Sequence, residues 1–443
     1  MIRNQNINFV LFYFLYWLIT NANSFDFISL IILSFIIATL TKYLLRDFSI
    51  GLKLLLMVGL IIFPLLLQGN YKIILLPVGY QYISISLISS LIFIETKKKS
   101  IISQLSLFQL SRDLCIAALC PLTYIAGPSA SIEEIKIEEN YKPSQYENFN
   151  LGALEKSIEG FLKVLLGNYL ASLDNIFNYD LISQENFLPL KIIYFLTFGF
   201  YNFWKYFLLF AGASELCEAF LMVIRIKVIK NFNQPYLITF YHEIWSRWHL
   251  NITDRIRENL FTPITLISLR KFSNLNPIIS FILIEGFPAL TLFALIAVWH
   301  GGKEIDVIFA LISVVLTIIS RLISRNIKLN NILKNNCFIK EFISFISISV
   351  FGLALSIYSL NLKQEIIFYR SLEIKTNFLI LIFLILINLY LRYKSSFLAE
   401  VNQKRFHEER VYFSIFEFIF SLSIISSGLI PLQTGLDFIY YGN

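Results

Sequence analysis

Two histidines in apolar surroundings are the residues of this chain best suited to chemistry. His300 ends an apolar segment between Trp299 and Gly301, and His249 follows Trp248 just before a polar stretch. A neutral imidazole can take a proton from a hydroxyl group near pH 7. Titratable side chains in or beside a membrane are costly and usually functional. We therefore predict that His300 acts as a general base.

Each histidine also has a simpler interpretation. His300 could only hydrogen-bond a neighbouring helix, and His249 could lie at a membrane interface among aromatic anchors. In a functional role, His249 could position a donor or hold a charged intermediate, with Arg247 and Asn251 close to it in the sequence. His407 stands among Lys and Glu side chains and is expected to be solvated.

Other catalytic motifs do not occur in the sequence. His242-Glu243 begins like a metalloprotease helix, but the next histidine is seven residues further on instead of four. We therefore expect no metal site. The run Gly212-Ala213-Ser214-Glu215 lacks the closing glycine of a nucleophile elbow, so a serine-bound intermediate is not predicted.

The composition is typical of a membrane protein. Of the 443 residues, 56% are hydrophobic and only 15% are charged, whereas about a quarter of a soluble globular domain is charged. Apolar runs of about twenty residues recur, and this is the length that one helix needs to cross a bilayer. The net charge of +7 arises from Lys and Arg in short loops, which indicates positive-inside topology rather than a nucleic-acid surface.

We predict an all-α polytopic membrane protein with roughly eleven to thirteen helices, in which residues 1–443 form a single integral membrane domain. Residues 151–177 could be an amphipathic interfacial helix or a poor span. The predicted spans are residues 7–20, 25–41, 50–67, 73–94, 105–126, 187–211, 215–229, 278–299, 305–320, 342–360, 377–393 and 411–432.

Residues 241–271 interrupt this pattern because charged side chains alternate there with Ile, Leu, Trp and Phe. Such a segment must lie in the interface or dip into a protein-lined cavity, since polar groups at membrane depth need partners other than lipid. If it is helical, Trp245 and His249 share one face at i, i+4. The two spans after it have basic outer ends, which predicts that the turn at His300 faces away from the cytoplasm or lies within the membrane.

Six short patches occur in order along the chain. They are Leu76-Pro77-Val78-Gly79, Pro121-Leu122-Thr123, Phe210-Ala211-Gly212, Asn231-Phe232-Asn233-Gln234-Pro235-Tyr236-Leu237, Trp245-Ser246-Arg247-Trp248-His249-Leu250 and Trp299-His300-Gly301. Together they resemble the membrane-bound O-acyltransferase family, most of all its bacterial alginate O-acetylation and D-alanyl transfer proteins. The recognisable core covers about residues 70–330, and helices in 331–443 are less recognisable. The resemblance implies a ring of tilted helices around a central tunnel.

The resemblance also implies roles for particular residues. His300 would be the catalytic residue that deprotonates an acceptor hydroxyl, and His249 would be the second catalytic histidine, with a supporting role. The residues expected along the substrate tunnel are Trp245, Arg247, Trp248, Asn251, Trp299 and Gly301.

The function that this resemblance implies is acyl transfer by a multi-pass enzyme of the bacterial cytoplasmic membrane. An acetyl or other short acyl group would pass from a cytoplasmic thioester, such as acetyl-CoA, to a hydroxyl of an envelope polysaccharide or of a secreted acetyltransferase partner. No tightly bound cofactor is expected. An acyl or D-alanyl carrier protein is the alternative donor, with a teichoic-acid-like polymer as acceptor. A different interpretation is a transporter or channel with a histidine proton relay, although the chain has no inverted repeat.

Overall fold

The computed structural model describes residues 24–44, 80–97, 106–118, 146–173, 188–223, 230–300 and 302–356, together with residues 56, 59, 61, 385 and 388. Within these residues every regular element is a helix, so the predicted all-α class is confirmed. The chain divides into two compact units. The first comprises Met1–Asn150, Cys217–Asn231 and Leu250–Ala310, and the second comprises Leu151–Leu216, Phe232–His249 and Leu311–Asn443.

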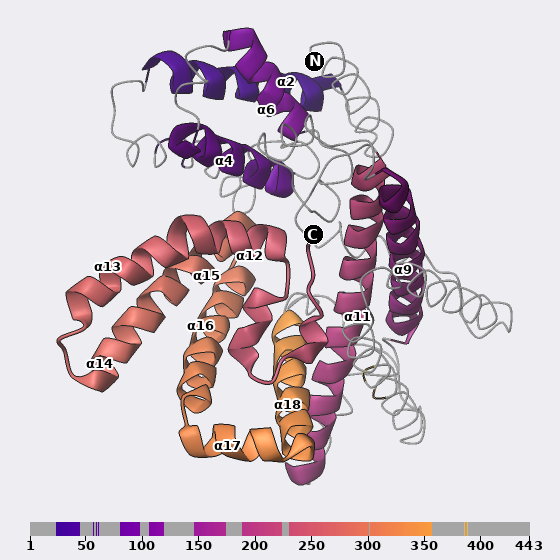
Figure 1. The fold of residues 1–443 in the computed structure, drawn as a ribbon, viewed down its shortest axis with the longest axis vertical. Helices are drawn as coiled ribbons and strands as arrows, with labels where there is room; N and C mark the ends of the chain where they lie inside the picture. Colours follow the sequence, from indigo (N-terminus) through magenta and orange to yellow (C-terminus); the bar gives the residue numbers. More distant parts are fainter. Residues whose placement is uncertain are drawn as a thin grey trace, which may run out of the picture. The chain divides into compact units, whose positions relative to one another are not determined.

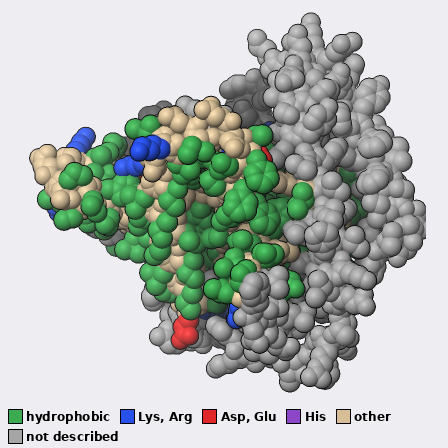
Figure 2. All heavy atoms as spheres, turned by 90° about the horizontal axis from the view of Figure 1, so that it is seen from below, with side chains coloured by type: hydrophobic (Ala, Val, Ile, Leu, Met, Phe, Trp, Pro, Cys, Tyr) green, Lys and Arg blue, Asp and Glu red, His purple; other side chains and the backbone are tan. Residues whose placement is uncertain are grey.

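Among the described residues, three helical stretches are long and apolar enough to cross a membrane. They are Pro277–His300, α16 (Glu304–Ser324) and α18 (Cys337–Ser356), and they correspond to the predicted spans 278–299, 305–320 and 342–360. Hydrophobic side chains cover much of the described surface drawn in Figure 2, and on α16 they include the exposed Leu311 and Val315. Apolar outer faces of this kind suit contact with lipid chains.

The predicted spans 7–20, 50–67, 377–393 and 411–432 lie outside the described residues, apart from the single positions 56, 59, 61, 385 and 388. The predicted single membrane domain, like the ring of helices and the tunnel, stays a prediction.

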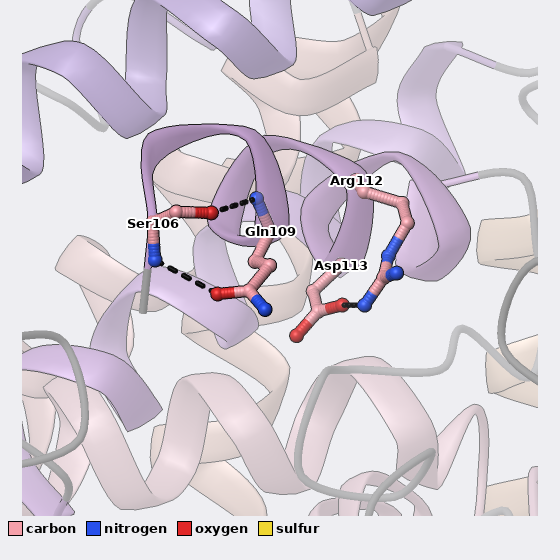
Figure 3. A network of polar contacts seen from close by, with 4 residues as sticks. All are labelled: Ser106, Gln109, Arg112 and Asp113. Carbon is pink, nitrogen blue, oxygen red and sulfur yellow. Dashed lines mark hydrogen bonds and ion pairs between the residues drawn. The ribbon is translucent and has the colours of Figure 1, made fainter. Parts of the chain in front are cut away.

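The described part of the first unit includes α2 (Ser24–Thr39), the π-helical turn η1 (Leu40–Leu44), α4 (Tyr80–Lys97) and α6 (Leu107–Ala118). The N-terminus of α6 has a capping box, drawn in Figure 3: Ser106 N–H donates to Gln109 Oε1 at 2.9 Å, and Gln109 N–H donates to Ser106 Oγ at 3.2 Å. These two bonds satisfy donors that a helix start leaves without partners.

The rest of the first unit contains α12 (Leu250–Ile256), η6 (Arg257–Phe261), α13 (Thr262–Phe272), α14 (Pro277–Phe281), η7 (Ile282–Gly286) and α15 (Phe287–His300). α13 and α14 are joined by a short turn (Figure 1). Asn276 caps α14 because its side chain accepts a hydrogen bond from Ile278 N–H at 3.0 Å, and Pro277 occupies the first helical turn, where no N–H donor is needed. The predicted span 278–299 therefore starts at a well-defined cap.

The second unit contains most of the long helices α9 (Tyr146–Ser172) and α11 (Leu188–Val223), together with α17 (Ile327–Asn335) and α18. The prediction of two separate spans at 187–211 and 215–229 was wrong, because α11 is continuous through Gly212. A Cβ atom added at Gly212 would lie 2.7 Å from the carbonyl oxygen of Gly160 in α9. Gly212 therefore permits close packing of two helices and does not end one.

Charged side chains are also paired between α9 and α11. Lys163 Nζ forms a salt bridge with Glu215 Oε1, and both side chains are largely buried. Burial of either charge alone would be strongly unfavourable. The polar pattern of residues 151–177 therefore reflects a helix that faces another helix, and it does not require an interfacial position.

α11 also packs closely against α18. A Cβ atom added at Gly199 would lie 2.1 Å from the carbonyl oxygen of Ser349, and one added at Gly352 would lie 1.8 Å from that of Gly199. The core beside this crossing is mainly aromatic, and its largest fully buried side chains include Phe200, Tyr201, Phe203, Trp204 and Phe351.

Candidate functional site

Residues 232–249 form an irregular segment that we call the His249 loop. It contains two short 3₁₀ helices, η4 (Pro235–Leu237) and η5 (Tyr241–Ser246). Gln234 precedes η4 with a φ of 48°, which lies in the left-handed region, and the proline at the first position of η4 lacks an N–H donor. The chain therefore reaches Trp245 through tight turns instead of an α-helix.

The backbone of the His249 loop finds its hydrogen-bond partners within the protein. Ser344 Oγ donates to the carbonyl oxygen of Ile238 at 2.5 Å, and Ser347 Oγ donates to that of Thr239 at 2.9 Å. Thr239 N–H donates to Glu243 Oε2 at 2.8 Å. Non-helical backbone at membrane depth is tolerated when it is buried in protein. Residues 241–271 were expected to lie in the interface or to dip into a protein-lined cavity, and the choice between the two stays a prediction.

Two side chains of η5 are held by hydroxyl groups of α16. Trp245 Nε1–H donates to Thr317 Oγ1 at 3.1 Å. Ser320 Oγ lies 3.1 Å from the backbone nitrogen of His242, which donates to it, and 3.0 Å from His242 Nδ1. Residues three apart share a face of a 3₁₀ helix, and residues three apart also neighbour each other on an α-helix. His242 and Trp245 of η5 are therefore spaced to meet Ser320 and Thr317 of α16, and the two contacts fix the register of η5 along α16.

Trp248 belongs to the aromatic core of the second unit. Its ring centroid lies 5.0 Å from those of Phe232 and Phe351 and 6.0 Å from that of Phe203. The side chain is 7% exposed. Such contacts anchor the C-terminal end of the His249 loop.

His249 has a φ of 52°, an unusual value for a residue other than glycine. Conformations of this kind cost about 1–3 kcal/mol and persist where the surroundings enforce them, often at functional sites. The imidazole lies edge-on to the ring of Phe210, with a centroid distance of 4.8 Å and an interplanar angle of 88°. Because the backbone turns at Arg247 and His249, the conditional helical relation of Trp245 and His249 at i, i+4 does not hold.

Arg247, near the end of the His249 loop, is hydrogen-bonded to the segment just before η4. Its backbone carbonyl accepts from Asn233 N–H at 2.9 Å, and its guanidinium Nη1 donates to the carbonyl of Asn233 at 3.2 Å.

Asn251 follows Leu250 in the first unit and is 0% exposed. The side chain of Asp254 pairs with Arg257 at 2.9 Å; partial burial raises the pKa of that carboxyl group, while the nearby Arg257 charge opposes this shift.

His300 is the last residue of α15 and is a half-buried residue. The imidazole lies 4.7 Å from the Trp299 ring, centroid to centroid, at an angle of 69°. Gly302 follows with a φ of 69°, and its N–H donates to the carbonyl of Ala297 at 2.9 Å. A left-handed glycine of this kind closes a helix C-terminus. Lys303 N–H then donates to Asp306 Oδ2 at 2.9 Å, which caps the start of α16.

The structure places the predicted residues in two groups. Trp299, His300 and Asn251 belong to the first unit, and Trp245, Arg247, Trp248 and His249 belong to the second. Gly301 lies outside the described residues. The roles assigned to all of these residues stay predictions.

Four hydroxyl residues that hold the His249 loop were not predicted from the sequence. They are Thr317, Ser320, Ser344 and Ser347. A detectable signal existed, because within each apolar span the two hydroxyl residues are three positions apart and can share a helix face.

Replacement of Ser344 by Ala is expected to lower the thermal stability of the detergent-solubilised protein. The change removes the donor to Ile238 and leaves a buried carbonyl without that hydrogen bond, which costs about 1–3 kcal/mol. The measurement is the midpoint of thermal unfolding followed by fluorescence-detected size-exclusion chromatography. Thr291→Ala is the control, since Thr291 Oγ1 bonds a carbonyl of its own helix at an exposed position; an equal shift in both variants would contradict the prediction.

Comparisons with known proteins find relatives among enzymes of cell-envelope polymers, although no protein-family model matches the chain. The chain is 27% identical over 191 residues to a peptidoglycan O-acetyltransferase of Helicobacter pylori, which covers 42% of this chain and 33% of that protein. It is 23% identical over 179 residues to a teichoic acid D-alanyltransferase of Bacillus subtilis, and this alignment covers 40% of this chain and 43% of that protein. A probable alginate O-acetylase of Azotobacter vinelandii is 28% identical to it over 94 residues, and this alignment covers 21% of this chain and 19% of that protein. Each match spans less than half the length of the relative.

Proposed function

We propose that this chain transfers acyl groups to hydroxyl groups of a cell-envelope polymer. Its relatives are members of the membrane-bound O-acyltransferase family, which is the family that its motifs predicted. The observation that carries the proposal is the position of His300. This half-buried residue ends a membrane-length helix directly before a glycine turn. The names of the relatives add the class of acceptor, since peptidoglycan, teichoic acid and alginate are all polymers of the cell envelope or surface.

In the proposed reaction, His300 removes the proton of the acceptor hydroxyl while the oxygen attacks the thioester carbonyl carbon. A carbon–oxygen bond forms, the carbon–sulfur bond breaks, and the imidazolium returns its proton to the leaving thiolate. The products are an ester and a thiol. A positioned general base of this kind contributes about 10²- to 10⁴-fold to a rate. The edge of Trp299 against the imidazole restrains the orientation of the ring.

The His249 loop has a supporting role in this proposal. Trp245 and Arg247 contribute to the substrate tunnel, and both are partly exposed. Trp248 and Asn251, which are both buried, are also proposed to contribute to the tunnel. Trp299 and Gly301 belong to the wall beside His300.

The proposed donor is a cytoplasmic thioester, and acetyl-CoA is the first candidate. A D-alanyl or acyl carrier protein is the second, and the likeness to a teichoic acid D-alanyltransferase supports D-alanine as the alternative acyl group. The acceptor is an envelope polysaccharide or a secreted acetyltransferase that completes the transfer. The chain would act as a multi-pass protein of the bacterial cytoplasmic membrane, with its helices in a ring around a tunnel.

The proposal is tested by the ester content of isolated envelope polymers from otherwise identical cells with and without the chain. Mild base releases ester-linked groups, and chromatography then quantifies acetate and D-alanine separately. We expect one of the two to rise when the chain is present, with acetate indicating acetyl-CoA as the acyl source and D-alanine indicating the carrier protein. If no ester-linked acyl group rises although the chain is present in the membrane fraction, the proposed function is wrong.

A further inference from the structure

The two ends of the His249 loop meet in a neck of backbone hydrogen bonds. Leu250 N–H donates to the carbonyl of Asn231 at 2.8 Å, and two residues further into the loop Asn233 N–H donates to the carbonyl of Arg247 at 2.9 Å. The loop is therefore closed at its base.

One buried carboxylate completes the neck. Glu218 Oε1 accepts a hydrogen bond from Asn231 N–H at 2.9 Å. Glu218 is 5% exposed and Asn231 is 0% exposed. Both backbone polar groups of Asn231 are thus bound, its N–H by Glu218 and its carbonyl by Leu250. The buried backbone of Asn231 is thus held from both sides, which fixes its position.

The neck lies directly beside the strained residue of the loop. His249 has its left-handed φ of 52° between two residues whose N–H groups are bound. Trp248 N–H donates to the carbonyl of Ile244 at 2.8 Å, and Leu250 N–H donates to Asn231. A backbone conformation of this kind reverts to an ordinary one when its neighbours are released.

We propose that Glu218 is a positioning residue for His249. Glu218 holds Asn231, Asn231 holds Leu250, and Leu250 holds the backbone of His249 in the conformation that directs its imidazole. Glu218 itself touches no reacting atom. This inference rests on the proposed acyl transfer, in which His249 supports the reaction.

Two variants of Glu218 separate positioning from packing. Glu218→Gln keeps an oxygen that can accept from Asn231 N–H, whereas Glu218→Leu has a similar size and no acceptor. The probe is radiolabelled acetyl-CoA supplied to membrane vesicles, with the initial rate of base-labile ester formation measured at varied donor concentration. We expect Glu218→Leu to lower kcat at least about tenfold with little change in KM, because small misplacements of a working group are costly. Glu218→Gln is expected to stay within about twofold of the wild-type kcat, because its amide oxygen can still accept a hydrogen bond from Asn231 N–H.

The amount of folded protein in each vesicle preparation is measured by size-exclusion chromatography and used to normalise the rates. If Glu218→Leu folds poorly, Glu218→Ala replaces it in the same comparison with Gln. Equal kcat values for the Gln variant and the variant without an acceptor would overturn the inference. Ester formation that is unaffected by removal of the His300 imidazole would instead overturn the proposed function, so the two failures are distinguishable.

Discussion

Replacement of His300 by Ala is expected to abolish ester formation by this chain, with a loss of at least about 100-fold in rate. The reason is chemical. An alcohol is a poor nucleophile at neutral pH, and the imidazole at the end of α15 is the group proposed to take its proton. The measurement is ester-linked acyl content of the envelope polymer, released by mild base and normalised to the amount of chain in the membrane.

The matched control is His407→Ala, the same substitution in a charged stretch of sequence that lies outside the described residues. It should leave ester content unchanged. Retained ester formation in His300→Ala at normal protein level would show that His300 is not the base. Because Trp299 borders the imidazole at 4.7 Å, a protein-level comparison is needed to exclude a packing defect.

The second large effect is expected at the crossing of α11 and α18. In Gly352→Ala, the added methyl group would lie 1.8 Å from the carbonyl oxygen of Gly199 and 2.7 Å from the backbone nitrogen of Phe203. Both neighbours are backbone atoms, so no side chain can move aside and the helices must separate. We expect a destabilisation at or above the upper end of the range for overpacked cores, about 1–3 kcal/mol. Thermal unfolding in detergent and the yield of monodisperse protein measure it.

Gly59→Ala is the control for this experiment, because no atom lies within 4 Å of a Cβ atom added there. That helical position is exposed, and an alanine in a helix is intrinsically favoured over glycine by roughly 1 kcal/mol. The control should therefore be neutral or slightly stabilising. Equal stability of Gly352→Ala and wild type would mean that α11 and α18 are not in contact at Gly199.

The class of fold could be predicted because lipid imposes a length on apolar helices that is readable from composition alone. The predicted span 305–320 became α16 (Glu304–Ser324), and the span 278–299 became Pro277–His300. The resemblance of the motifs to a known family was also detectable, because short runs such as Trp245–Leu250 keep their order along the chain.

The division of α11 into two spans failed for a physical reason. The predicted spans left residues 212–214 between them, and glycine is intrinsically a weak helix former. In the structure Gly212 lies against Gly160 of another helix, and the close packing of the two backbones outweighs the intrinsic preference. A contact between residues so far apart in sequence cannot be read from a local pattern.

The turns between Trp245 and His249 were beyond prediction for the same reason. The residues of this stretch are compatible with a helix, and what holds them in 3₁₀ and left-handed conformations comes from elsewhere. Thr317 lies 72 positions after its partner Trp245, and Ser320 lies 78 positions after its partner His242. The candidate site could therefore be predicted as a set of residues, but the conformation of the loop could not.

The serines of α18 have a consequence for the order of biogenesis. Ser344 is 106 residues downstream of Ile238, and Ser347 is 108 downstream of Thr239. During synthesis, the carbonyl groups of Ile238 and Thr239 enter the nascent chain long before these hydroxyls exist. A ribosome-bound intermediate that ends before Cys337, where α18 begins, must leave this backbone solvated or shielded by insertion machinery. Once α18 is complete, its serines can bond these carbonyl groups, and the His249 loop can be buried away from water.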